Sequence, residues 1–353
     1  MPLRFYHGVH ILVLLVALLA AGCAGHPGAA PTTNDMQQVQ DALKQAMDTL
    51  DADTGSEDLL LITNAGYGHA NGLPTEAYID QAVAATGCTP GQRRLVGVVT
   101  PDDESLWFAL YKSGSGQSVF LRLTPQGVAS QPIDLSPEAI LTPQAWSAAK
   151  AGPMGPRIFS IVSISLSWSA GAPWPLIMAA QLHDHICPGL NAGYLIREYV
   201  RTALPKGKGD RYVFVGAPPF CAMDALQVLE GTTVGKKGAM AMMVKGPKGA
   251  GVPTGIIALR VNAKNDVCDG LVLGVDWPII WDLSGVRGED MAPPGGPSNP
   301  LFHITRTIMS VKLAQMPLAE KMACIKEVDR FKGPAKLAKA IMGAKADPYS
   351  LVP

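Results

Sequence analysis

The 353-residue chain has no net charge and few aromatic residues. Lys and Arg together number 29, as do Asp and Glu, so the formal charge is zero and the isoelectric point lies near 7. Nucleic-acid-binding proteins carry an excess of positive charge, which is missing here. Aromatic residues make up only 6% of the chain, whereas Gly (37) and Pro (29) are abundant. This composition favours many turns over long helices and argues against a nucleic-acid partner.

The sequence also lacks a complete nucleotide-binding loop. Residues 231–236 are one residue too short for a Walker A loop, and neither Ser nor Thr follows the lysine. Residues 66–72 have the wrong spacing for a dinucleotide-binding GxGxxG motif, and no acidic partner for a ribose is suitably placed. We therefore predict no nucleotide cofactor.

Long apolar runs are absent after the first segment of the chain. That segment carries Arg4 and then an unbroken apolar run over residues 11–21, which fits a signal-peptide core and is too short to span a bilayer. The run ends in Leu-Ala-Ala-Gly-Cys, which resembles a bacterial lipobox. We predict a lipoprotein signal peptide over residues 1–22, lipidation of Cys23 as the membrane contact, and a periplasm-facing location in the bacterial cell envelope. The alternative is ordinary signal cleavage near residues 21–24.

The cysteines are few and do not form any CxxC pair. Of the six, five remain if Cys23 is lipidated, and five cannot all pair within one chain. In an exported protein an odd thiol favours a metal ligand, a reactive thiol or an intermolecular bridge. The other interpretation is that some cysteines are small buried hydrophobic residues, which we expect for Cys324 in its apolar surroundings.

Two short blocks contain the residues best suited to chemistry. The first reads His-Asp-His-Ile-Cys-Pro-Gly over residues 183–189, and the second reads Cys-Ala-Met-Asp-Ala-Leu-Gln over residues 221–227. In an extended segment, residues two and four positions apart face the same side, so the two histidines and the cysteine of the first block would converge. Pro188 suits the first position of a helix, which places Cys187 at or near the N-cap. Free N–H groups and partial positive charge there would stabilise a thiolate.

The second block adds a thiol, a carboxylate and an amide. Asp224 lies one helical turn after Cys221, and Gln227 lies one turn further, so the three line one stripe of a helix. Cysteine thiolate and neutral imidazole are the ligands that zinc prefers, with four in a structural site or three and an open position in a catalytic one. We predict a transition-metal site, with zinc as the expected ion. Its ligands would be His183, His185, Cys187 and Cys221.

Three classes of function remain open for such a site. In an enzyme, the ion would polarise a substrate or activate water, with Asp224 as acid or base and Cys187 as a ligand or nucleophile. A carrier or sensor would hold a metal or metallo-cofactor without turnover, and a thiol-redox protein would use Cys187 and Cys221. Gln227 and Lys236 would bind the small molecule or metallo-cofactor. The structural alternatives are a plain Cys187–Cys221 disulfide and an Asp224 that only caps its helix or pairs with a lysine.

The two blocks together resemble the FmdE family, which takes its name from formylmethanofuran dehydrogenase. That family has an HxHxCPG segment, then a Cys-x-x-Asp-Ala-x-Gln helix that leads into a Gly-x-Thr-x-Gly-Lys turn, and all six side-chain positions match here. The similarity covers roughly residues 172–275 and implies an α+β core, a dimer, and motif residues in a crevice. Thr232 stands where many members have Cys, and the C-terminal zinc finger of many members is missing. The family name comes from a cytoplasmic molybdenum or tungsten enzyme, so it does not imply formyl chemistry for an exported chain.

We predict an α+β fold with an FmdE-like core of mixed strands and helices over residues 156–290. A tether and helix over residues 23–56 and a smaller α+β region over residues 57–155 precede this core, and C-terminal helices over residues 291–353 follow it. Recurring prolines between residues 125 and 156 indicate a loop-rich connection. Further expectations are a strand over residues 159–166 and helices near residues 302–313, 318–328 and 335–342.

Overall fold

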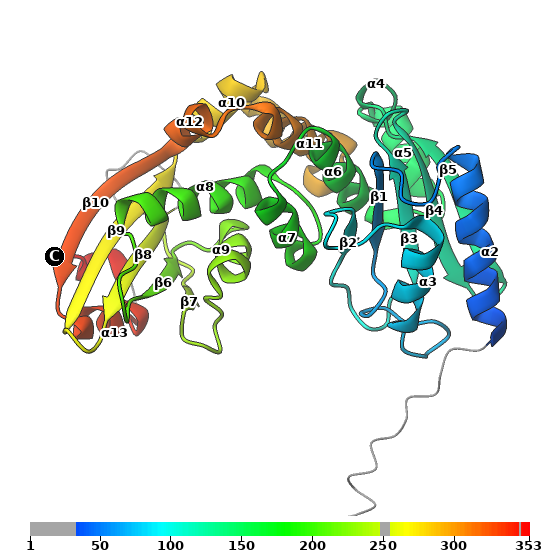
Figure 1. Ribbon diagram of the computed structural model, residues 1–353. Coiled ribbons are helices and arrows are strands. Elements are labelled where there is room, and N and C mark those ends of the chain that lie inside the picture. The colour runs from blue at the N-terminus through cyan, green and yellow to red at the C-terminus, as the bar shows by residue number, and fades with distance from the viewer. Residues whose placement is uncertain (1–32, 248–254, 346) are drawn as a thin grey trace, which may run out of the picture.

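The computed structural model of the chain describes residues 33–247, 255–345 and 347–353, so the signal peptide and Cys23 lie outside the described residues. Within these ranges the fold is mixed α+β, with two five-stranded mixed sheets and twelve α-helices, which confirms the predicted class. The sheets lie at opposite ends of an arched molecule, and a group of helices lies between them (Figure 1). Among the described residues, no helix combines the length and hydropathy needed to cross a membrane.

The N-terminal half is built on a sheet with strand order β2-β1-β3-β4-β5. The strands are β1 (Leu59–Thr63), β2 (Leu95–Gly97), β3 (Trp107–Lys112), β4 (Gln117–Thr124) and β5 (Gly127–Asp134). Helices α2 (Thr33–Thr49) and α3 (Ala77–Thr86) pack on the face that carries Leu59, Leu61 and Phe108. The opposite face, with Leu60 and Trp107, packs against the central helices. Both faces are therefore buried, which explains the uninterrupted apolar run in β1.

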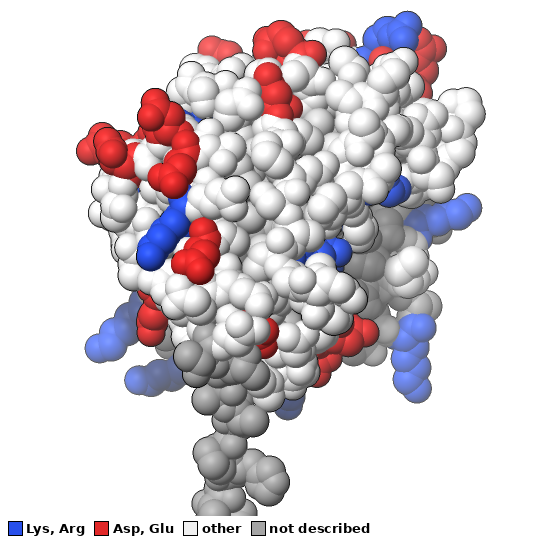
Figure 2. Space-filling model, turned by 90° about the vertical axis from the view of Figure 1, so that its right-hand side faces the viewer, with Lys and Arg blue, Asp and Glu red and all other residues white. Residues whose placement is uncertain are grey.

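The side of this half that carries α2 and β5 is weakly charged. Figure 2 shows a surface that is uncharged over most of its middle, with Asp and Glu gathered toward its upper and left edges. Strand β5 forms the edge of the sheet, and it occupies part of the proline-rich segment that we predicted to be loop. Pro132 is tolerated there because an edge strand leaves alternate N–H groups unpaired. That loop prediction was wrong for residues 127–134.

The central helices form a layer that joins the two sheets. They are α4 (Pro137–Ile140), α5 (Pro143–Ala151), α6 (Ile158–Ser169), α7 (Trp174–His183) and α11 (Pro300–Gln315). The predicted strand over residues 159–166 was wrong, because this segment is helix α6. Its alternating serines are not on a solvent face: Ser163 and Ser165 are both fully buried. A helix that is buried on all sides shows no amphipathic stripe, so its sequence is easily mistaken for a strand.

The C-terminal half is built on a sheet with strand order β10-β9-β8-β6-β7. The strands are β6 (Arg211–Gly216), β7 (Ala239–Ala241), β8 (Gly255–Asn262), β9 (Val267–Val275) and β10 (Ile325–Gly333). Helices α8 (Pro188–Ala203), α9 (Ala222–Glu230) and α10 (Trp277–Ser284) contribute to the core on one face, and α13 (Ala335–Met342) covers the other. The predicted helices over residues 302–313 and 335–342 are confirmed.

The predicted helix over residues 318–328 was wrong for most of its length. Helix α12 (Leu318–Lys321) is short, a 3-10 turn follows at Met322–Cys324, and the chain then enters β10. Strand β10 pairs antiparallel along β9, from Ile325 opposite Val275 to Gly333 opposite Cys268. This pairing satisfies the backbone groups of β9, and such a long-range gain outweighs local helix propensity. Cys324 is fully buried, as expected.

Glu230 links the end of α9 to α8 and to the loop that follows α8. Its side chain is only 1% exposed and accepts from Arg197 and Arg201 of α8 and from Lys206. Burial opposes ionisation of Glu230, but hydrogen bonds from Lys206 and Arg201 outweigh it and lower the pKa of the carboxyl. The carboxylate therefore adds stability at neutral pH, and this stability is lost as the pH falls through the lowered pKa.

Replacing Glu230 with Gln is expected to reduce the free energy of unfolding at pH 7 by about 1.5–3 kcal/mol, the scale of hydrogen bonds to charged groups. The difference from wild type should begin to shrink as the pH falls below about 4.3, the ordinary pKa of a glutamate, and should continue to shrink through the lowered pKa of Glu230. Urea unfolding curves at pH 7 and pH 3.5 measure this. An equal loss at both pH values would contradict the role of the charge.

Candidate metal centre

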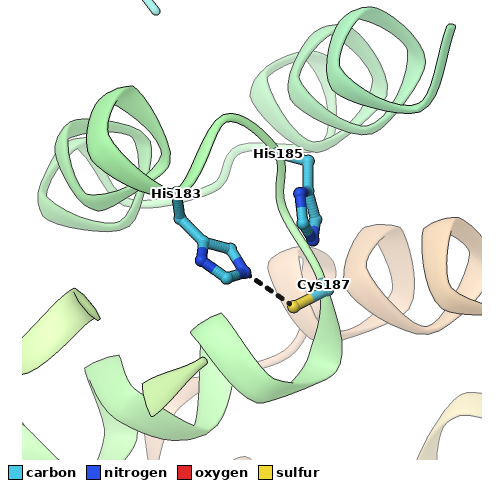
Figure 3. Close-up of side chains that lie close together, drawn as sticks. All are labelled: His183, His185 and Cys187. Carbon is cyan, nitrogen blue, oxygen red and sulfur yellow. Dashed lines mark hydrogen bonds between the residues drawn. The ribbon is translucent and has the colours of Figure 1, made fainter. Parts of the chain in front are cut away.

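The first block forms a tight turn between two helices rather than an extended segment. Helix α7 ends at His183, and Asp184 turns the chain with φ 64° in the left-handed region. Cys187 is the N-cap of α8, with extended backbone angles, and its Sγ accepts from the N–H of Leu190 at 3.4 Å. The predicted N-cap position is confirmed, whereas the predicted extended geometry was wrong. The two histidines and the cysteine still converge, because the turn folds the end of α7 back toward the start of α8 (Figure 3).

Two central helices hold the backbone of this turn. The N–H of Ile186 donates to the hydroxyl of Ser163 in α6 at 3.0 Å. The carbonyl of Ile186 accepts from the hydroxyl of Ser310 in α11 at 3.3 Å. Because both backbone groups are buried, leaving either one unpaired would carry a free-energy cost. The serines therefore fix the path of the chain between the histidines and Cys187.

The ligand atoms of the first block form a compact group. One ligand atom each from His183, His185 and Cys187 lies within 4.8 Å of the other two. The Sγ of Cys187 lies 3.7 Å from the Nε2 of His183, and both histidine rings lie beside the sulfur in Figure 3. A soft thiolate with two imidazoles is a donor set that suits zinc and related ions. The structure therefore brings together three of the four predicted ligands.

Each histidine is held by its own carboxylate. The Nδ1 of His183 lies 2.7 Å from Oδ2 of Asp224, and the Nδ1 of His185 lies 2.6 Å from Oδ1 of Asp184. A carboxylate at Nδ1 retains the proton on that nitrogen, so the lone pair of Nε2 is available to coordinate a metal. Metal-binding histidines are commonly oriented in this way. Asp224 was a predicted site residue. Asp184 was missed, although it lies between the two histidines in the sequence.

Cys221 reaches the site because two glycines let α9 approach α8 closely. A Cβ on Gly189 would lie 2.9 Å from Cβ and 3.1 Å from Sγ of Cys221, and a Cβ on Gly193 would lie 2.7 Å from the backbone of Ala222. Cys221 is close enough to Cys187 and His183 for both to influence the charge of its thiol. All five cysteines among the described residues are free, so the structure does not contain a Cys187–Cys221 disulfide. The fourth predicted ligand therefore lies near His183 and Cys187, but it is not part of the group of three whose ligand atoms lie within 4.8 Å of one another.

Burial and mutual contacts shift the pKa values of Cys187, Cys221 and His183. The hydrogen bond to Cys221 and burial raise the pKa of Cys187 well above its usual value, and the N–H groups at the helix start only partly oppose this. The hydrogen bond from Cys187 and the nearby His183 outweigh burial and lower the pKa of Cys221 to about 4. Burial disfavours a charged His183, but hydrogen bonds to Asp224 and Cys221 raise its pKa to about 9. The directions of these shifts favour a charged Cys221–His183 pair, and a bound cation would favour both thiolates.

Comparison with known proteins identifies the segment that carries this site. Residues 182–250 match a family described as FmdE, Molybdenum formylmethanofuran dehydrogenase operon. This segment is an FmdE domain. It contains both blocks and thus all four candidate ligands, and it leaves out the N-terminal half and the central helices before α7. No curated protein matches the chain.

A cavity of about 280 Å³ lies beside the candidate metal ligands His183 and Cys221. The polar residues that line it are His183, Cys221, Asp224 and Gln227. Its walls are otherwise apolar, from Pro219, Phe220, Met223, Val234, Ala239, Met240 and Ala241. Gln227 therefore lies where a bound small molecule would be in reach. Lys236 is exposed and does not line this cavity; its Nζ lies near Gly231.

Residues that the motif did not indicate also lie around the candidate metal site. The ring of Phe159, in α6, lies 4.5 Å from that of His185, and His303, in α11, lies 4.8 Å from Phe159. The guanidinium of Arg306, also in α11, is close enough to both site thiols to interact with their charge. These side chains come from helices far from the blocks in sequence, so spacing could not have revealed them.

Replacing Gly189 with Ala is expected to weaken metal binding by displacing Cys221. The new methyl group would overlap the side chain of Cys221, and one of the two helices would have to shift by a few tenths of an ångström. We expect roughly a 10-fold loss of zinc affinity, a loss typical of misplaced site residues. Competition with a chromophoric chelator measures it. Gly97→Ala in β2, where a Cβ would meet nothing within 4 Å, is the control, and equal losses in both variants would contradict the argument.

Proposed function

We propose that this protein binds a transition ion, most simply zinc, at His183, His185, Cys187 and Cys221. The observation that carries the proposal is the convergence of His183, His185 and Cys187 within 4.8 Å, with each histidine already oriented by a carboxylate. Such orientation lowers the cost of assembling the ligands when the ion arrives. Cys221, which borders both the ligands and the cavity, completes the set.

The cavity supports a role beyond simple storage of the ion. A zinc-class ion would polarise a bound group or activate water beside it. Asp224 orients His183 and also borders the cavity, so it is placed to accept or donate a proton of a bound molecule. The amide of Gln227 can hydrogen-bond that molecule, and the apolar walls can pack against its carbon atoms. We therefore infer a small-molecule ligand, with the metal carrier or sensor as the non-enzymatic form of the same function.

A second candidate function uses the two site thiols. Cys187 and Cys221 are neighbours and neither is in a disulfide, so a disulfide could form between a Cys187 thiol and a Cys221 thiolate: two electrons pass to an external oxidant and the one thiol proton is released. A thiolate attacks more readily than a thiol, and the lowered pKa of Cys221 favours Cys221 as the thiolate of the pair. Reversible formation of this disulfide in place of metal binding would favour the thiol-redox function.

We further propose that the chain is a bacterial envelope lipoprotein anchored by Cys23 and that it forms a dimer. The apolar run over residues 11–21 and the lipobox-like ending support the anchor, and the resemblance to FmdE proteins supports the dimer. Labelled palmitate should enter the wild-type chain and not Cys23→Ala. Light scattering of the detergent-purified chain measures its assembly, and a monomer would contradict the dimer.

Metal content is the decisive experiment for the proposed function. The full chain, purified in detergent without chelator, is expected to contain near one equivalent of zinc or another transition ion by mass spectrometry. His185→Ala should lose the ion. His69→Ala, which changes a histidine in an exposed turn, should retain it. A wild-type chain that takes up no ion when supplied with zinc would overturn the proposal.

A further inference from the structure

The N-terminal half reaches into the metal centre through a chain of polar contacts. It begins at Trp107, the fully buried first residue of β3, whose indole Nε1 donates to Oε1 of Glu104 at 3.0 Å. The same oxygen accepts from Nε of Arg157 at 2.8 Å, and a second nitrogen of Arg157 pairs with Oε2. Glu104 is thereby fixed by three donors and holds Arg157 in a two-bond pairing.

Arg157 then reaches the first block. Its remaining terminal nitrogen donates to Oδ2 of Asp184 at 3.0 Å, while Oδ1 of Asp184 pairs with Nδ1 of His185 at 2.6 Å. The contacts therefore run without a gap from the first sheet to a candidate metal ligand. They join residues more than 75 positions apart in the sequence, from Glu104 to His185.

Burial makes these contacts strong enough to orient a side chain. The side chains of Glu104 and Arg157 are 17% and 15% exposed, so their charges are largely removed from water. The Asp184 side chain is 38% exposed and could turn toward solvent if Arg157 did not hold it. Charge-assisted hydrogen bonds of this kind are roughly twice as strong as neutral ones.

The two histidines therefore depend on different parts of the chain. The partner of His183 is Asp224, which lies within the FmdE domain, on α9. The partner of His185 is Asp184, whose position is set by Glu104 and Arg157, both outside residues 182–250. An isolated FmdE segment would keep all four candidate ligands and lose the support of one of them.

We propose that the N-terminal half supports the metal centre: Glu104 of this half and Arg157, the residue before α6, are positioning residues that hold Asp184 and, through it, His185. The inference rests on the proposed metal-binding function. It assigns a role to a region that the two sequence blocks do not include. Neither positioning residue touches the ion; both act through the carboxylate of Asp184.

Zinc affinity of single variants provides the first test. Arg157→Gln and Glu104→Gln in the full chain are expected to bind zinc roughly 10–100-fold more weakly, the usual effect of removing a group that orients a ligand. Arg157→Lys should recover only part of the loss, because an ammonium cannot pair with both carboxylates at once. The control is Arg260→Gln, which removes an arginine of β8 that is paired to Asp269 of β9 and to Asp210, the residue before β6.

A double-mutant cycle separates positioning from general destabilisation. If Arg157 acts through Asp184, then Arg157→Gln should have little further effect on zinc affinity in an Asp184→Asn background. Asn tolerates the left-handed backbone at this position, so the variant removes the charge without forcing a new turn. Additive losses, or wild-type affinity in folded Arg157→Gln, would overturn the inference.

The metal-free chain gives a readout that does not depend on the ion. Histidine ¹⁵N spectra should show the Nδ1 of His185 protonated in the wild type, with a mixture of tautomers in Arg157→Gln and no change in Arg260→Gln. A wild type that binds no zinc overturns the proposed function, and the tautomer result then still decides whether Arg157 orients His185. An unchanged spectrum in Arg157→Gln would refute the positioning role.

Discussion

Cys187→Ser is expected to lower zinc affinity at least about 100-fold and to leave the purified chain nearly free of metal. Structural zinc sites bind with about 10–16 kcal/mol, so each of four ligands carries on the order of 3 kcal/mol, or about two powers of ten in affinity. Serine is a hard, neutral ligand, and a soft ion prefers thiolate. The substitution is specific to the ligand role because serine is a favoured N-cap residue and can still accept from Leu190.

A serine substitution at a second buried cysteine is the control that distinguishes the loss of a metal ligand from the loss of any buried thiol. Cys88 is buried and donates to the carbonyl of Leu59 at 3.4 Å, far from the site, so Cys88→Ser keeps a donor in the same place. Zinc content and chelator competition should change in Cys187→Ser and not in Cys88→Ser. Retention of a full equivalent of zinc by Cys187→Ser would show that Cys187 is not a ligand.

Trp107→Ala is expected to lower the free energy of unfolding by about 3–5 kcal/mol, the cost of removing a large aromatic side chain from a packed core. The ring is fully buried and lies 6.0 Å from that of Phe120 on the face of the first sheet that meets the central helices. The substitution leaves a cavity there and also removes one of the donors to Glu104. We therefore expect a loss of zinc affinity in addition to the loss of stability.

Trp107→Phe divides these two effects. It keeps most of the apolar volume and removes the indole N–H, so the stability loss should be smaller, at about 1–3 kcal/mol. Zinc affinity should fall in Phe and Ala variants alike if the N–H to Glu104 matters for the site. Urea unfolding of the metal-free chain and chelator competition measure the two quantities. An unchanged zinc affinity in Trp107→Phe would contradict the link from Trp107 to Glu104.

The strands and helices with clear periodicity were predictable from the sequence. Strand β1 is an apolar run, and its two buried faces require that pattern. Helix α8 begins where Pro188 indicated, with Cys187 as its N-cap. The strand predicted at α6 and the helix predicted at β10 were wrong for opposite reasons. Burial on all sides hid the helical period of α6, and pairing with β9 overrode the helical pattern near residues 318–328.

The sequence by itself determined which residues could hold an ion, because residue type and local spacing fix donor chemistry and the N-cap at Cys187. Only the tertiary structure decided how those donors are oriented. The carboxylate that holds His185, the close approach of α9 at Gly189, and the support from Arg157 arise where separate elements pack together. Such contacts depend on the packing of side chains distant in sequence, and no short motif encodes them.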